Sequence, residues 1–272
     1  MKLLTSLTIT IALVAPLLAQ TPAPTPSVAE VQAKQELNEA VRAYREGKFR
    51  EAQAHSERAL LLDPQNKTAP YFVARTIHVQ YKPGDFTPEN VAKARQAITA
   101  YQRILERSPS DDEVYKAVAY LYGALKEDEL LRKWILQRAG DVSLTNDKRA
   151  EAFVVLASKD WDCSFKITEL PSNKVTTVKR NKAYVSYQMP KERHEFDRAK
   201  ECANRGMEMA NMAITLTPES ESAWSYKTYI LLELGKLAEM LGDVQHKRDL
   251  HRQYEKALSE TTKLSKRSPL TP

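Results

Sequence analysis

The two cysteines carry the most specific chemistry in this sequence. Cys163 and Cys202 are its only cysteines. In an oxidising compartment such a pair can form a disulfide, and the alternative is two buried free thiols. Neither belongs to a C-x-x-C pair, so a zinc site is not expected. The outcome depends on where the protein resides and on the elements that carry the two residues.

The other candidates for chemistry are weak. Among five histidines, the closest pair is His246 and His251, which would lie about 140° apart around a helix. The seven glycines build no dinucleotide, P-loop or nucleophile-elbow motif. Asp160 and Asp162 flank an expected helix end, where carboxylates are usually solvated rather than paired for acid–base work. We therefore predict no enzyme activity, no catalytic residue, no metal and no cofactor.

The first residues predict export. A positive start at Met1 and Lys2 precedes an apolar run over 7–18, which is typical of a secretory signal peptide cleaved after Ala19, or alternatively after Ala23. The run is too short to span a membrane, and we expect no transmembrane segment in the mature form. Residues 20–31 form a proline-rich spacer. The predicted location is periplasmic or secreted, which argues against a nucleic-acid partner.

Apolar periodicity then predicts paired helices. Leu37, Ala40, Val41 and Tyr44 follow the three-and-four spacing of one helix face. Gly47 stops this helix, and a second amphipathic run over 49–62 ends before a proline. Two short helices cannot bury their apolar faces alone, so further repeats are expected.

These helices resemble the tetratricopeptide repeat family. The residues that carry the resemblance are Ala40, Gly47, Phe49, Ala52, Ala59 and Pro64. Similar units begin near Thr68, with an inserted loop over 82–88, near Asp111 and near Ser220. The resemblance implies an all-α solenoid of about five helix pairs over 32–268. It also implies that the first helices line a groove, through Leu37, Val41, Tyr44, Tyr71, Arg75, His78, Lys116, Tyr120 and Tyr229.

One segment breaks the helical pattern. Phe165, Ile167 and the β-branched residues over 175–185 are strand formers, which predicts a small β-hairpin near 164–190, inserted between the helices of the fourth unit. Residues 164–193 carry seven basic and two acidic residues. The first helix of this unit is expected over 147–159. Cys163 then lies where it ends and Cys202 near the start of the second helix, so a disulfide is expected to close the insertion.

Two functions from different classes follow. The first is an exported scaffold that binds a peptide or protein in the groove and assists assembly of a cell-envelope complex. The alternative is an envelope-surface binder that uses the basic insertion 166–193, through Lys174, Lys179, Arg180 and Lys182, on anionic lipid or polysaccharide. The lysines could instead only prevent edge-to-edge strand pairing. An enzyme with its site in the insertion is a third hypothesis.

Overall fold

The computed structural model describes residues 26–267. The predicted signal peptide, 1–19, lies outside the described residues, as do residues 20–25 of the predicted spacer. Residues 28–31 of that spacer are helical instead, because Ser27 caps the first helix. The Glu30 amide donates to Ser27 Oγ at 3.2 Å and the Ser27 amide donates to Glu30 Oε2 at 2.6 Å. This capping box was readable as Ser-x-x-Glu in the sequence.

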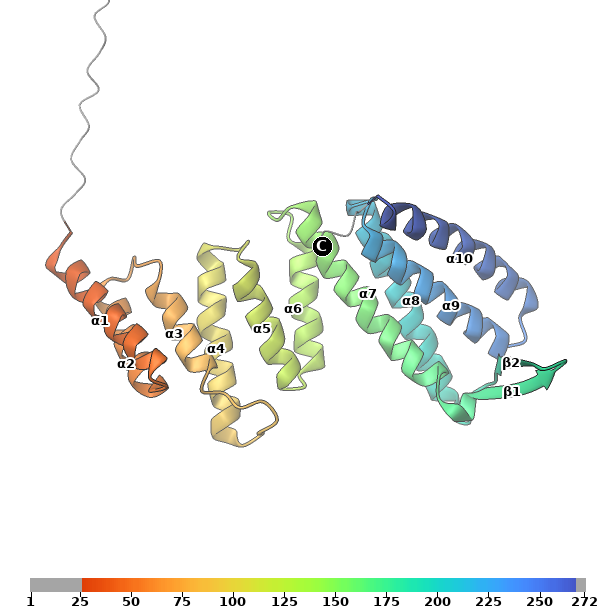
Figure 1. The fold of residues 1–272 in the computed structure, drawn as a ribbon, viewed down its shortest axis with the longest axis horizontal. Coiled ribbons are helices and arrows are strands. Elements are labelled where there is room, and N and C mark those ends of the chain that lie inside the picture. Colours follow the sequence, from red (N-terminus) through yellow and green to blue (C-terminus); the bar gives the residue numbers. More distant parts are fainter. Residues whose placement is uncertain (1–25, 268–272) are drawn as a thin grey trace, which may run out of the picture.

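The described chain is a row of antiparallel helix pairs (Figure 1). Within residues 26–267 the ten α-helices are α1 (Val28–Arg45), α2 (Phe49–Leu62), α3 (Ala69–His78), α4 (Pro88–Arg107), α5 (Asp112–Ala124), α6 (Asp128–Gly140), α7 (Asn146–Thr168), α8 (Arg193–Leu216), α9 (Glu221–Met240) and α10 (Val244–Ser265). Each helix packs on the next, and α7 also contacts α9. The predicted all-α array of five helix pairs is confirmed.

The same tight turn joins the helices of the first, third and fifth pairs. Gly47, Lys126 and Gly242 adopt left-handed φ angles of 76°, 57° and 70°. In each turn the following amide donates to the carbonyl five residues earlier, as in Lys48 N to Ala43 O at 2.9 Å. This is the Schellman arrangement that ends helices. Gly47 stops its helix as predicted, and the turn recurs at Lys126 despite the cost of a side chain there.

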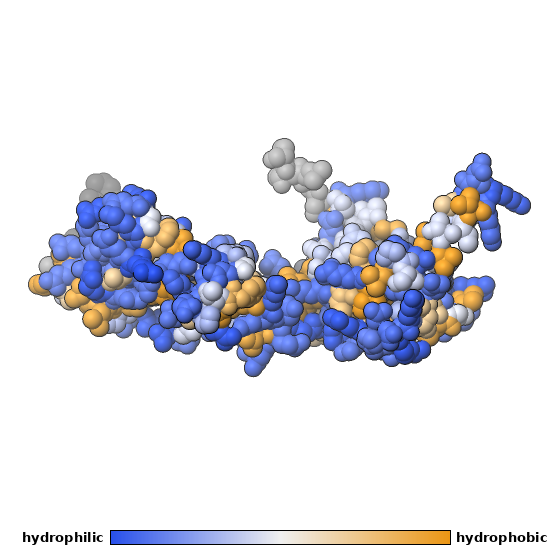
Figure 2. All heavy atoms as spheres, turned by 90° about the horizontal axis from the view of Figure 1, so that it is seen from below, coloured by the Kyte–Doolittle hydropathy of each residue, from blue (hydrophilic) through white to orange (hydrophobic). Residues whose placement is uncertain are grey.

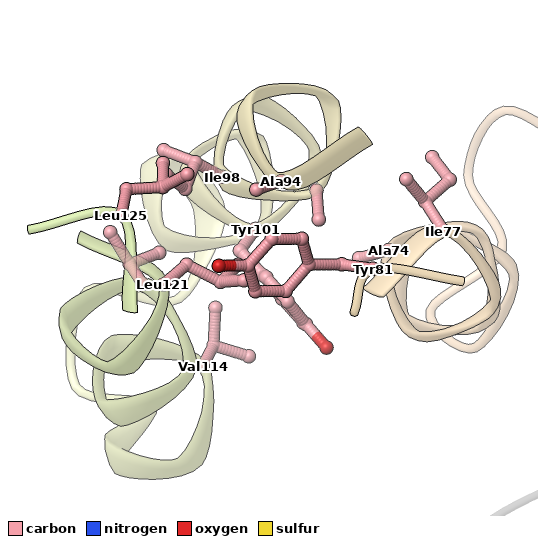
Figure 3. Close-up of a cluster of buried hydrophobic side chains, with 11 residues drawn as sticks. Ala74, Ile77, Tyr81, Ala94, Ile98, Tyr101, Val114, Leu121 and Leu125 are labelled. Carbon is pink, nitrogen blue, oxygen red and sulfur yellow. The ribbon is translucent and has the colours of Figure 1, made fainter. Parts of the chain in front are cut away.

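Small residues let the paired helices approach closely. Ala40, Ala52 and Ala59, which carry the repeat pattern, are fully buried. A larger cluster joins α3, α4 and α5, where Tyr101 and Tyr81 lie among aliphatic side chains (Figure 3). Within residues 26–267 the core comprises four such clusters along the row, each built from neighbouring helices.

The inserted loop of the second pair is ordered by one buried side chain. Asn90, near the start of α4, accepts from the Lys82 amide at 2.9 Å. Its Nδ2 donates to the carbonyls of Lys82, at 2.8 Å, and Asp85, at 2.7 Å. One amide thus satisfies three backbone groups of the loop, which fixes its course.

The fourth pair differs from the prediction in its boundaries. Helix α7 runs to Thr168, so Phe165 and Ile167 are helical, not strand residues. Ile167 packs in the cluster between α7, α8 and α9, and Phe165, which is 37% exposed, packs on Trp161 of the same helix; these contacts override their β propensity. After the short 3-10 helix η1 (Pro171–Asn173), strands β1 (Lys174–Lys179) and β2 (Lys182–Tyr187) pair antiparallel, which confirms a hairpin within the predicted insertion.

The molecule is elongated, and the hairpin projects from one end of it (Figure 2). No helix in the part of the chain that the structure describes has both the length and the hydropathy needed to cross a membrane.

Candidate functional site

A pocket opens between the first helices of the N-terminal pairs. It encloses about 320 Å³. Its lining comes from α1, α3, α4, α5 and the residue after α3, and comprises Tyr44, Tyr71, Arg75, His78, Val79, Tyr101, Glu113 and Ala117. Four of the nine predicted groove residues therefore share one pocket. The other lining residues were not predicted. Tyr101 lies on α4, the second helix of its pair, whereas the resemblance implied groove residues on the first helices alone.

Arg75 is the main cation of this pocket. Its guanidinium lies 5.2 Å from the centre of the Tyr44 ring, and its Nε donates to Tyr44 Oη at 3.4 Å. The hydrogen bond with Tyr44 raises the pKa of Arg75. Within residues 26–267 no carboxylate forms an ion pair with it. A fixed charge beside aromatic faces, with donors left over, suits a carboxylate or another hydrogen-bond acceptor of a ligand.

His78, three residues after Arg75 on α3, also lines the pocket. Its Nδ1 lies 3.2 Å from Tyr101 Oη, and its ring packs edge-on against Tyr101 and tilted against Tyr120, both at 5.7 Å. Burial lowers the pKa of His78 and raises the pKa of Tyr101 to about 12. Both groups are therefore neutral near pH 7, and the charged side chains of the pocket lining are Arg75 and Glu113.

The remaining predicted groove residues lie outside this pocket. Leu37 and Val41 are half-buried on α1, and Lys116 pairs with Glu113 at 3.8 Å. Tyr120 is 52% exposed and touches the pocket only through His78. Tyr229 lies in a separate aromatic cluster with Trp161, Phe165 and Tyr226, between α7 and α9.

The cysteines are joined by a disulfide. The Cα atoms of Cys163 and Cys202 are 6.0 Å apart, within the ordinary range for the bond. Because α7 is longer than expected, Cys163 lies inside the helix rather than at its end, and the bond ties α7 directly to α8. It therefore links two helices beside the hairpin rather than the ends of the inserted segment.

A buried ion cluster accompanies the disulfide, and it corrects the expectation for Asp160. Asp160 is only 2% exposed, in the interior of α7 rather than at a helix end. Arg132 Nη1 donates to its two oxygens at 3.0 and 3.1 Å, and Arg205 Nη2 donates at 3.2 Å. Arg205 Nη2 also lies 3.5 Å from Cys202 Sγ. The two guanidinium groups hold this carboxylate in the contact between α6, α7 and α8.

The base of the hairpin is fixed by a second ion cluster. Glu169 accepts from Lys236 at 2.7 Å, Lys174 at 3.0 Å and Tyr187 Oη at 2.8 Å. Burial alone would raise the pKa of Glu169, but these hydrogen bonds lower it to about 2. Lys236 also donates at 2.6 Å to Glu233, which is 1% exposed. This cluster joins α7, α9 and both strands, so it sets the direction of the hairpin.

Among the described residues, no three His, Cys, Asp or Glu side chains are grouped to hold a metal ion.

Comparison with known proteins gives a distant likeness of fold. No family model and no curated protein matches the chain. The similar solved structures include the MamA RS-1 ArsTM double mutant, at 13% identity over 86% of this chain and 95% of that one, with a TM-score of 0.41. YrrB, a TPR protein with an unusual peptide-binding site, matches at 11% identity over 85% and 92%, with a TM-score of 0.36. The TPR2AB domain of yeast Sti1 in a pHSP90 complex matches at 14% identity over 84% and 98%, with a TM-score of 0.31.

Proposed function

We propose that this chain is an exported, non-enzymatic scaffold that binds a peptide segment of a partner protein in the pocket between α1, α3 and α5. The observation that carries the proposal is the pocket itself, where Arg75, without an acidic partner among the described residues, lies among Tyr44, Tyr71 and Tyr101. A rigid helical frame presents these groups before a ligand arrives, so binding costs little ordering entropy.

The chemistry of the pocket favours a segment with an apolar or aromatic side chain next to a carboxylate. The rings of Tyr44 and Tyr71 offer flat apolar faces, and Arg75 offers a guanidinium whose charge does not titrate near neutral pH. The carboxylate could belong to an acidic side chain or to a C-terminus. We further propose that the partner belongs to a cell-envelope complex whose assembly the scaffold assists.

Export is supported by the sequence before residue 26 and by the Cys163–Cys202 bond, since disulfides persist in oxidising compartments. The proposed location is the periplasm or the extracellular space.

Selection from a displayed peptide library tests the proposal. Residues 20–272 are used as bait, with free and blocked C-termini presented separately. We expect selected peptides to contain a carboxylate beside an apolar residue. Arg75→Gln should weaken their binding by about tenfold or more, because it removes a charge-assisted hydrogen bond.

Arg103→Gln is the matched control, because it removes an exposed cation of α4 that does not line the pocket. Tyr71→Ala tests the apolar part of the site. Peptides that bind all three variants as well as the parent would show that the pocket is not the binding site.

A further inference from the structure

The β1–β2 hairpin is anchored at its base and uncovered along its length. Its base is held by the Glu169 cluster and by the Tyr187 amide, which donates to Glu239 Oε1 on α9 at 3.3 Å. Beyond the first residue of β1 and the last of β2, every residue of both strands is exposed. Figure 2 shows this arm rising from the end of the body, with hydrophobic surface toward its base and a hydrophilic tip.

Apolar side chains are exposed on both faces of the arm. The register pairs Thr176 with Val185 and Val178 with Ala183, so these four uncharged residues share one face, with the Lys174–Tyr187 pair at its base. On that face Val178 is 71% and Val185 is 52% exposed. On the other face Tyr184 is 52% exposed. A two-stranded hairpin without a covering layer is only marginally stable in water, so this much exposed apolar surface indicates a partner that covers it.

The tip of the hairpin concentrates positive charge in a locally unfavourable arrangement. Lys179 and Lys182 lie directly opposite each other, and like charges in such a pair repel. Arg180 and Asn181 form the turn with φ angles of 50° and 60°. Turns of this kind favour glycine, asparagine or aspartate at both positions, so arginine at the first is strained. Within the described residues none of the three cations forms an ion pair.

We propose that this arm docks on an anionic lipid bilayer, with Val178, Val185 and Tyr184 at the boundary of the acyl chains and the tip cations at the lipid phosphates. The arm would lie along the surface, and the long basic side chains would reach up to the headgroups. Each basic residue near an anionic leaflet adds favourable energy, and tyrosine suits the interface.

Two features favour lipid over other anionic partners. A soluble anionic polymer would engage the tip but would leave Val178 and Val185 in water. An ordinary protein surface would cover one face of the arm and leave the other exposed. A bilayer interface is a medium that can surround the arm, so it can cover apolar side chains on both faces while it neutralises the tip.

Vesicle co-sedimentation tests the proposal, using residues 20–272, which omit the apolar run over 7–18 and retain every described helix. The vesicles are phosphatidylcholine alone or phosphatidylcholine with 30% phosphatidylglycerol, a composition on the order used to mimic an anionic leaflet. We expect binding only to the anionic vesicles, and weaker binding as salt is raised. The variant Lys179→Gln/Arg180→Asn/Lys182→Gln should bind about 100-fold more weakly.

The control variant is Arg248→Gln/Arg252→Gln/Lys256→Gln, which removes the same charge from exposed positions of α10 and should bind as the parent does. Val178→Thr/Val185→Thr keeps the charge and the β-branched shape and should bind about tenfold more weakly. Thermal melting checks that each variant is folded.

Four outcomes would overturn the proposal. The first is that the parent does not bind anionic vesicles, and the second is that the tip and α10 variants lose vesicle binding equally. The third is that the valine variant binds as fully as the parent. The fourth is tip-dependent binding to dextran sulfate without binding to vesicles. The last outcome would assign the arm to a soluble anionic polymer. None of these results bears on the pocket between α1, α3 and α5, because the vesicles contain no peptide.

Discussion

Helices α1–α6, the N-terminal half, and helices α7–α10, the C-terminal half, bury similar alanine-rich faces but treat their polar groups differently. Among the described residues of the N-terminal half no carboxylate is buried: Lys48 and Glu46 form an exposed ion pair, which stabilises little, and the buried Arg138 pairs with the more exposed Asp112. In the C-terminal half Asp160 and Glu233 are almost fully buried and bound to cations, and a disulfide joins α7 to α8.

The difference matches the lengths of the helices. Helices α7 and α8 have 23 and 24 residues, whereas α3 has 10. Long helices with small side chains can slide past each other at a modest cost in packing energy. Buried polar pairs and a covalent bond fix one relative position of the two helices. The N-terminal half lacks such a bond and leaves Arg75 free among aromatic rings. We infer that the C-terminal half is built to hold its geometry and that the N-terminal half is built to receive a ligand.

The largest expected effect comes from cutting the disulfide. Cys163→Ser/Cys202→Ser releases a loop of 39 residues, which should cost about 4 kcal/mol of unfolding free energy on the chain-entropy model. Hydrogen exchange read by mass spectrometry should speed up in α7–α9 and stay unchanged in α1–α4. Equal acceleration along the whole chain would show that the two halves unfold as one unit. Reduction of the parent protein should reproduce the effect of the double variant.

Two glycines of the C-terminal half test how closely its helices pack. A Cβ on Gly206 would lie 3.0 Å from Ile230 Cδ1 and 3.1 Å from Asp160 Cβ, whereas one on Gly235 would meet nothing within 4 Å. Gly206→Ala should destabilise by about 1 to 3 kcal/mol, because the Asp160 backbone cannot yield easily. Gly235→Ala should stabilise by about 1 kcal/mol through helix propensity. Urea unfolding measures both, and stabilisation by Gly206→Ala would mean that the α7–α8 contact can yield.

The Glu169 cluster predicts a pH dependence of the C-terminal half. Because the folded pKa of Glu169 is about 2, below the ordinary value of 4.5, its contribution is present above pH 4.5 and is lost as the pH falls toward 2. With allowance for solvent screening, that contribution is on the order of 1 to 2 kcal/mol. Glu169→Gln should remove it at pH 7 and flatten the stability curve between pH 4.5 and 2. Parallel curves for variant and parent would contradict this assignment.

The smallest effects concern two tyrosines of the N-terminal half. Tyr81 Oη is buried without a hydrogen-bond partner among the described residues, whereas Tyr101 Oη bonds to His78. Figure 3 shows the two rings within one apolar cluster. Tyr81→Phe should stabilise by about 1 kcal/mol and Tyr101→Phe should destabilise by a similar amount. If both changes destabilise in thermal melting, Tyr81 has a hydrogen-bond partner in solution.

Much of the fold was predictable because it is encoded locally. The spacing of Ala40, Ala52 and Ala59 indicated which faces pair, and Gly47 marked a turn that the structure repeats. The partners in the disulfide were also predictable, since the chain has only two cysteines. The groove assignment stays a prediction, and only Tyr44, Tyr71, Arg75 and His78 of its members share a pocket.

The sequence by itself determined the repeat, its turns and the presence of a hairpin, because periodicity and turn residues act over a few neighbouring positions. Only the tertiary structure decided that α7 extends to Thr168, that Asp160 is buried, and that Tyr101 joins the pocket. These outcomes depend on contacts between residues far apart in the chain, such as Arg132 and Arg205 on Asp160. In the sequence, a carboxylate in a helix looks the same whether its side chain faces water or two guanidinium groups. Only the packing of the helices distinguishes these two environments.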